Sequence, residues 1–276
     1  MKTYLRYPMI LTDSTATKSK VPNEAKEELE ILFNKCEAYC INSTLRIILL
    51  PIDSNLYGEV MSFINRYKEW ANKLVTYEHK FTKTEIQRSE YFLVASKSLV
   101  CIKGSIGECF ESCCSNGSLL GNQKDYFKVN RVDIKNKLFT ATNTCRYFIT
   151  QLLKDSLTQQ SFTNIQFLPV YDDKTDDVVA YQVEVNEVMP SLSELNGWIT
   201  YKECSHCGKK IYDVIQNYPH PFYLPANIKT SLKDFNATLE TFSEADAKYY
   251  IISRRFLEAL ESMGVKGLIC QPIVFK

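Results

Sequence analysis

The sequence lacks the features that several protein classes require. No window of about 18 uninterrupted apolar residues occurs, so no transmembrane helix is expected. The apolar stretch at the N-terminus is short and broken, with no small-residue cleavage site after it, so no secretory signal is expected either. Neither sign of charge is in large excess, because the chain has 33 Lys and Arg residues and 32 Asp and Glu residues. Since general nucleic-acid binding needs a basic surface, we expect a cytoplasmic protein with no nucleic-acid or membrane partner.

Signatures of catalysis are also scarce. Histidine occurs only at His79, His206 and His220, and the sequence contains no GxSxG, no glycine-rich phosphate loop and no HExxH. A Cys–His pair is one way to build a nucleophile with its base. Ten cysteines and three histidines allow many such pairs, and nothing in the sequence favours one of them. We therefore expect a protein without chemistry of its own.

Cysteine, by contrast, is abundant. Disulfides rarely persist in a reducing cytosol, so most of the ten cysteines are expected to be small buried hydrophobes. Cys101, Cys145 and Cys270 fit this expectation best, because each lies in an apolar run.

One cysteine pair has the spacing of a metal site. Residues 204–208 read Cys-Ser-His-Cys-Gly, and such a turn points two thiolates at one centre, as in half of a zinc ribbon. Cys204, Cys207 and His206 are therefore candidate zinc ligands. A structural zinc takes four ligands, and the chain has no second Cys-X-X-Cys. Further ligands remain open among His220, the pair Cys36 and Cys40, and the group Cys109, Cys113 and Cys114.

Two other interpretations of this element remain. A metal-free turn needs no further ligand. A redox pair normally begins a long helix, whereas Lys209, Lys210 and a proline-containing segment follow here. Zinc is thus the cofactor to test, and none is certain.

Apolar spacing divides the chain into helices and strands. Helical stripes are predicted over residues 24–40 and 60–77, the second with Phe63, Tyr67, Trp70 and Leu74 on one face. Runs at 45–52 and 89–104 are typical of strands. A loop near 115–124, rich in Asn, Gly and Ser, is the candidate boundary. We thus expect an N-terminal α/β region over 1–120, either a separate domain or one layer of a continuous fold, and a C-terminal region over 121–276.

The C-terminal region contains an internal repeat. Residues 147–170 resemble residues 250–273 without gaps, so that Tyr147 matches Tyr250 and Pro169 matches Pro272, and further upstream Phe139 matches Phe242. Each copy is predicted to be a strand, a helix of about three turns, a tight turn and a strand. Two unrelated units of this common type remain the alternative. The sequence predicts an α+β (mixed α/β) fold with two pseudo-repeated strand–helix–strand units and helices packed on a sheet.

Three pieces of the C-terminal region resemble bacterial immunity proteins of polymorphic toxin systems. They are the Cys204–Gly208 element, the segment PHPFYLP at 219–225, and the terminal stretch KYYIISRRFLEALESMGVKGLICQPIVF at 248–275. The chain is most similar to the immunity families with a CxxCG element. Some of these carry two such elements, and this chain has one, which leaves a complete zinc site in doubt.

The resemblance implies a cytosolic protein that binds a cognate toxin domain and neutralises it by stoichiometric occlusion. The acidic turn at 172–177 is then a candidate contact for a basic toxin, by electrostatic steering. Its carboxylates are Asp172, Asp173, Asp176 and Asp177, and a solvated hairpin turn is the alternative for them. The alternative function is a zinc- or thiol-dependent enzyme that uses Cys204 and Cys207.

Overall fold

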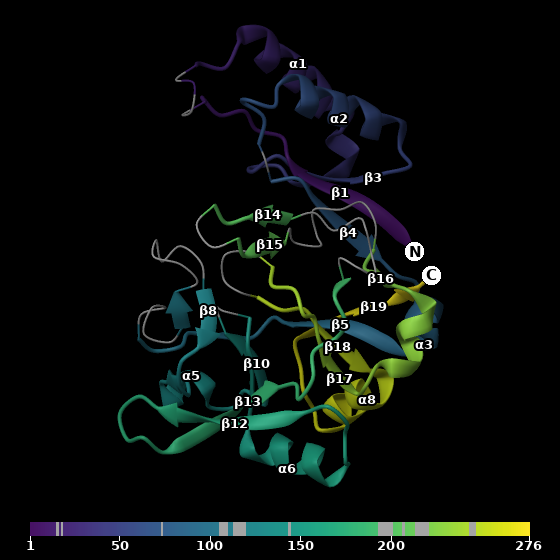
Figure 1. Ribbon diagram of the computed structural model, residues 1–276. Helices are drawn as coiled ribbons and strands as arrows, with labels where there is room; N and C mark the ends of the chain where they lie inside the picture. The colour runs from purple at the N-terminus through teal and green to yellow at the C-terminus, as the bar shows by residue number, and fades with distance from the viewer. Residues whose placement is uncertain are drawn as a thin grey trace. The chain divides into compact units, whose positions relative to one another are not determined.

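The chain forms two compact units in the computed structural model (Figure 1). The model describes residues 1–14, 17, 19–72, 74–104, 110–112, 120–142, 145–192, 201–205, 208–212, 221–242 and 247–276. The N-terminal unit comprises Met1–Glu85 with Ile215–Pro221, and the C-terminal unit comprises Ile86–Val214 with Phe222–Lys276. Both contain strands, and helices occur in both, so the predicted mixed fold is confirmed. None of the helices in the described part is long and apolar enough to cross a membrane.

The N-terminal unit is a four-stranded antiparallel sheet with two helices. The sheet order is β2-β3-β1-β4. These strands are β1 (Lys2–Pro8), β2 (Cys40–Asn42), β3 (Ile47–Pro51) and β4 (Thr76–Lys80), and the helices are α1 (Asn23–Lys35) and α2 (Asn55–Arg66), with the 3-10 turn η1 (Glu37–Tyr39) after α1. The predicted α1 stripe is confirmed, because Leu29, Leu32 and Cys36 are buried in one core with alternate strand residues.

The second predicted helix was too long. α2 ends at Arg66, Leu74 is 66% exposed, and the chain from Thr76 pairs with β1 instead. Tyr67 and Trp70 still contact the core of this unit. The helical spacing of apolar residues therefore continues past the end of α2 into a turn. From Thr76, pairing of β4 with β1 satisfies the backbone hydrogen bonds that a longer helix would have satisfied.

The C-terminal unit is built on two larger sheets. Their orders are β6-β10-β11-β13-β12-β9 and β17-β18-β5-β19. The first contains β6 (Leu99–Val100), β9 (Lys128–Val129), β10 (Phe139–Thr142), β11 (Tyr147–Ile149), β12 (Gln166–Asp172) and β13 (Val178–Glu184). The second contains β5 (Tyr91–Ser96), β17 (Phe235–Ala237), β18 (Tyr250–Ser253) and β19 (Leu268–Pro272).

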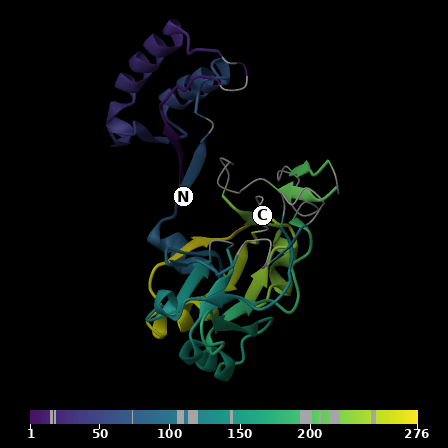
Figure 2. The same cartoon turned by 90° about the vertical axis from the view of Figure 1, so that its left-hand side faces the viewer.

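Among the described residues of this unit are also helices and three two-stranded pairs. The helices are α3 (Lys83–Arg88), which leads in from the N-terminal unit, α5 (Arg131–Ile134), α6 (Gln151–Gln159), α8 (Arg254–Ser262) and the 3-10 helix η3 (Ala226–Ser231). The small pairs are β7 (Phe110–Ser112) with β8 (Leu120–Gln123), β14 (Tyr201–Glu203) with β15 (Lys210–Tyr212), and β16 (Tyr223–Leu224) with β20 (Val274–Phe275). Figure 2 shows α6 and α8 at the same end of the unit.

The two predicted strand–helix–strand units have the expected order. α6 and α8 have equal length and begin 103 positions apart, after β11 and β18. Both helices open on a hydroxyl cap, Thr150 or Ser253. Both end in a turn with two left-handed residues at matching places, Ser161 and Asn164 in the first copy and Gly264 and Gly267 in the second.

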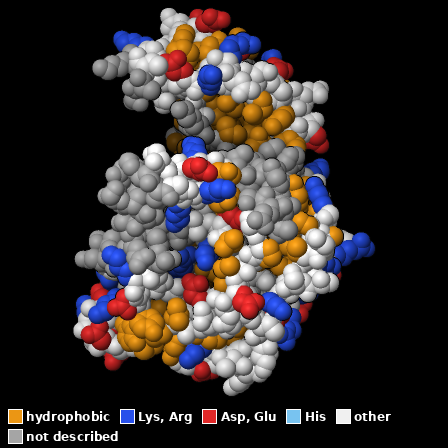
Figure 3. Space-filling model, in the orientation of Figure 1, with side chains coloured by type: hydrophobic (Ala, Val, Ile, Leu, Met, Phe, Trp, Pro, Cys, Tyr) orange, Lys and Arg blue, Asp and Glu red, His pale blue; other side chains and the backbone are white. Residues whose placement is uncertain are grey.

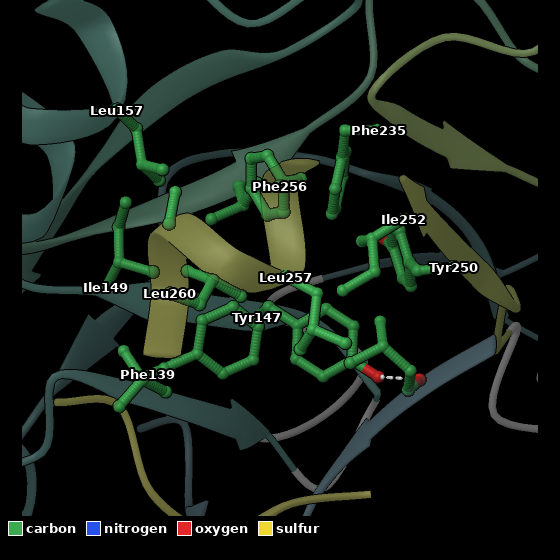
Figure 4. Close-up of a cluster of buried hydrophobic side chains, with 14 of the residues drawn as sticks. Phe139, Tyr147, Ile149, Leu157, Phe235, Tyr250, Ile252, Phe256, Leu257 and Leu260 are labelled. Carbon is green, nitrogen blue, oxygen red and sulfur yellow. Dashed lines mark hydrogen bonds between the residues drawn. The ribbon is translucent and has the colours of Figure 1, made fainter. Parts of the chain in front are cut away.

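The two copies meet in one core (Figure 4). The matched tyrosines Tyr147 and Tyr250 contact each other with ring centroids 5.0 Å apart. The buried face of α8 consists of Phe256, Leu257 and Leu260, which all lie in this cluster. Among the charged residues of α8, Arg255, Glu258 and Glu261 are exposed and Arg254 is partly buried.

One predicted match within the repeat was wrong. Phe139 pairs across strands with Ile149, and the residue that pairs with the matching Ile252 is Phe235, not Phe242. The segments Phe-Thr-Ala-Thr (139–142) and Phe-Asn-Ala-Thr (235–238) are therefore the equivalent ones. The second connection is seven residues longer, so a comparison without gaps aligns the wrong phenylalanine.

The central strand of each sheet comes from a different place in the chain. β13 lies between β11 and β12 and follows them in sequence. β5 occupies the same position between β18 and β19 but precedes both. Because of this pairing, the compact units divide after Glu85 and not at the loop near 120, where the sequence placed the boundary. Most of that loop lies outside the described residues.

Candidate functional site

The Cys-X-X-Cys-Gly element lies at the tip of the β14–β15 hairpin. The backbone N–H of Cys204 donates to the Lys209 carbonyl at 2.9 Å, and the N–H of Gly208 donates to the Cys204 carbonyl at 2.8 Å. Gly208 has φ +70°, which favours glycine at this turn. His206 and Cys207 lie outside the described residues. Within the described ranges, no group of three or more His, Cys, Asp or Glu is placed to hold a metal ion.

The other proposed zinc ligands are only partly described. Cys36 is buried in the core of the N-terminal unit, and burial raises the pKa of its thiol to about 11. Metal binding needs a thiolate, so this environment opposes ligation by Cys36. Cys40, on β2, is half-buried. His220 and the group Cys109, Cys113 and Cys114 lie outside the described residues.

The expectation of burial was wrong for two of the cysteines in apolar runs. Cys101 and Cys145 are exposed, and Cys270 is half-buried. Cys101 lies between buried Val100 and Ile102, so it points to the opposite face. Cys145 sits in a left-handed turn, at φ +56°, before β11. Apolar neighbours in the sequence thus predict a strand here, but not the face on which the thiol lies.

The acidic turn joins β12 and β13, as predicted, and two of its carboxylates share one arginine. Nε of Arg131 lies 3.1 Å from Oδ2 of Asp172, and Nη2 of the same guanidinium lies 2.7 Å from Oδ2 of Asp177. The Asp172 side chain is only 7% exposed, whereas that of Asp177 is 63% exposed. Asp172 is therefore placed to hold the turn, and Asp177 faces solvent.

The other two carboxylates are paired as well. Asp176 lies 2.5 Å from the ammonium group of Lys128, and Asp173 lies 3.9 Å from that of Lys103. With Lys174 inside the turn, four acidic side chains are thus accompanied by four basic ones. Their charges balance at neutral pH, so this corner offers a partner little net negative charge. A role of the turn in steering remains a prediction.

The sheet of the N-terminal unit has a second, apolar face that the sequence analysis did not identify. Side chains alternate between the faces of a strand. In β3, Ile48 and Leu50 are buried in the core, so Ile47, Leu49 and Pro51 point to the opposite face, where they are partly exposed. We call the side of the sheet opposite the helices the outer face.

The strand register joins these residues to apolar residues of β1. Pro51 lies opposite Tyr4, and Ile47 lies opposite Pro8. Beside β3, Ile41 is 53% exposed and Leu45, in the turn that precedes β3, is 54% exposed. Hydrophobic atoms are visible over the N-terminal unit in the space-filling view (Figure 3). The outer face thus carries partly exposed apolar side chains along β3, with Tyr4 and Pro8 of β1 beside them.

The opposite side of this unit carries a groove between α1 and α2. Its lining includes Ile31, which is 61% exposed. Two ion pairs connect the helices beside it, Lys35 with Glu59 at 2.6 Å and Arg66 with Glu28 at 2.9 Å. Both pairs are largely exposed, so they add little to stability, and they place charged side chains along the groove.

No protein-family model matches this chain, and a search of curated proteins finds no match either.

Proposed function

We propose that the protein is an immunity-type protein that binds a cognate toxin domain inside the producing cell and neutralises it by stoichiometric occlusion. The observation that carries the proposal is the outer face of the N-terminal sheet. Apolar side chains that reach the surface together on one sheet face support an interaction site there. The resemblance of the C-terminal region to immunity proteins supplies the class of partner.

The outer face suits binding because its backbone is already ordered. β1 and β3 are paired on both sides within the sheet, so their residues lose little backbone entropy when a partner docks. Tyr4 adds an aromatic ring held by Lys80, whose ammonium group lies 4.7 Å from the ring centroid. Tyrosine is enriched among residues that dominate binding energy.

The size of the sheet sets a requirement on the partner. Three inter-strand gaps of about 4.8 Å and a strand of seven residues give a planar patch of about 14 Å by 23 Å. A stable interface covers roughly 800 Å² of each partner. The toxin must therefore also contact loops around the sheet, and the turn with Leu45 is the nearest apolar candidate.

Co-expression tests the proposal. A cell that produces the toxin encoded beside this gene should survive only when this protein is present in at least equal amount. Loss of protection when the toxin is in excess is expected, because occlusion consumes one protein per toxin. Rescue at clearly substoichiometric levels would indicate an enzyme that acts on the toxin or its product. An adjacent gene whose product is not toxic would also contradict the proposal.

A further inference from the structure

The charged side chains of the outer face have an excess of one sign. Arg6 on β1 lies opposite Leu49 on β3, and Lys2 on β1 lies opposite Lys80 on β4. The acidic residue in this array is Glu78 on β4, which lies opposite Tyr4 and 3.8 Å from the ammonium group of Lys80. Three positive charges and one negative charge thus border the apolar half of the face.

We infer that the outer face is the docking surface for the toxin, and that the toxin surface it covers is apolar at its centre and acidic along one side. The inference rests on the proposed function and adds the site and the chemistry of the partner. Complementary charge across an interface speeds association and disfavours partners of the wrong sign. A basic surface, such as the substrate cleft of a nuclease, would meet Arg6, Lys2 and Lys80 with like charge.

The arrangement of charge also decides between this partner and a second copy of the chain. The basic side chains lie on β1 and β4, and apolar side chains cover β3 and the turn before it, with Tyr4 and Pro8 of β1 beside them. A two-fold pair of identical faces would bring the excess positive charge of both copies into one interface, where like charges repel and their desolvation is not compensated. An acidic partner compensates it.

The test compares two variants of one residue that differ in the sign of the new charge. Leu49→Glu and Leu49→Arg both remove the same apolar contact. Binding is measured with the purified toxin domain encoded by the adjacent gene, inactivated in its catalytic residue. The affinity of the Leu49→Glu protein should fall about 100-fold, and that of Leu49→Arg clearly less, because an acidic partner attracts the arginine. The same pair of changes at Leu152, 63% exposed on α6, should leave affinity unchanged.

Arg6→Glu changes an exposed position. Its result therefore does not depend on whether the protein folds with a charged residue at position 49. Its association rate should fall about 10-fold at low ionic strength and approach the wild-type rate in high salt, because salt screens the interaction. Thermal unfolding of each variant shows whether the sheet is intact.

Each contrary outcome has its own meaning. A larger loss for Leu49→Arg than for Leu49→Glu would indicate a basic partner and overturn the inference. Wild-type affinity in all three variants would place the toxin on another surface, although the proposed function would stand. Sedimentation of the wild-type protein as a dimer that Arg6→Glu or Leu49→Glu dissociates would assign the face to a second copy. A wild-type protein that neither binds nor protects would contradict the function itself.

Discussion

Asp234 joins the two repeated units through its carboxylate. Thr163, in the turn of the first copy, donates to Oδ2 through its N–H at 3.0 Å and its hydroxyl at 2.9 Å. Ser253 and Arg255 of the second copy donate to the same carboxylate at 2.8 and 2.6 Å. Burial by itself would raise the pKa of Asp234, but the hydrogen bonds from Arg255, Thr163 and Ser253 outweigh it and lower the pKa to about 2.

We predict that Asp234→Asn destabilises the protein by roughly 2 kcal/mol at pH 7, because each pKa unit corresponds to about 1.4 kcal/mol. The folded pKa of Asp234 lies below the unfolded value of about 3.9, so its contribution is present above pH 4 and is lost as the pH falls toward 2. Urea unfolding at several pH values measures this. The difference between wild type and variant should shrink below pH 4, and a constant difference would contradict the assignment. Glu258→Gln, at an exposed carboxylate, is the control.

Ser161 carries backbone strain that its counterpart avoids. It has φ +51°, whereas the matching residue of the second copy is Gly264 at φ +78°. A left-handed conformation costs a residue with a side chain roughly 1 kcal/mol. Ser161→Gly should therefore stabilise the protein, by up to about 1 kcal/mol after the added freedom of the unfolded chain is counted.

The reciprocal change gives the matched comparison. A Cβ at Gly264 meets no heavy atom within 4 Å, so Gly264→Ser adds strain without a clash and should destabilise. Chemical denaturation of the two variants measures both effects. Equal signs for the two changes would show that the turns are not equivalent.

At the scale of elements, the cap residues of the two matched helices differ in the hydrogen bonds that they make. The Thr150 hydroxyl accepts from the Leu153 N–H at 3.4 Å, and the Ser253 hydroxyl accepts from the Phe256 N–H at 3.1 Å. The Ser253 hydroxyl also donates to Asp234. Thr150 therefore caps its helix, while Ser253 caps its helix and also binds the Asp234 carboxylate.

We predict that Thr150→Ala costs about 1 kcal/mol, the usual cost of losing a cap, and that Ser253→Ala costs more. The additional loss should disappear when Asp234→Asn is already present, because the two residues then share no charged hydrogen bond. A double-mutant cycle on the free energy of unfolding measures this coupling. A coupling energy near zero would contradict the shared role.

The periodicity of apolar residues predicted the helices and strands of the repeated units well where one face of the element is buried. The α8 face and the order of both repeated units follow from the spacing of apolar residues. The upstream strand of the repeat was misplaced, because the connection to the second copy is longer and the short Phe-Asn-Ala-Thr segment, not Phe242, provides the equivalent strand. Strand partners are set by tertiary pairing, which a gapless comparison does not contain.

At the scale of the molecule, the surfaces that we propose for binding were harder to predict than the fold. The run Ile47–Pro51 is apolar at every position, which is typical of a strand buried on both faces, so its exposed side was not expected. The acidic turn was identified, but its balancing residues Lys128 and Arg131 lie far upstream in the sequence. Charge balance in three dimensions is not visible in a local cluster.

The position of β5 leads to a prediction about fragments. A fragment of residues 121–276 lacks the central strand of the second sheet, so β18 and β19 have no partner between them. We predict that this fragment fails to unfold cooperatively on heating, whereas a fragment of residues 86–276 does so. Circular dichroism against temperature compares the two. Cooperative melting of the shorter fragment would show that β5 is dispensable.

The same strand has a consequence for biosynthesis. β5 leaves the ribosome long before its neighbours, which begin at Tyr250 and Leu268. Its apolar sequence Tyr-Phe-Leu-Val-Ala-Ser must therefore remain unpaired until those neighbours have been synthesised, a state that favours aggregation. Closing so long a loop is also slow. Newly made chains should thus depend on chaperones until β18 and β19 have left the ribosome, because the second sheet can form only then.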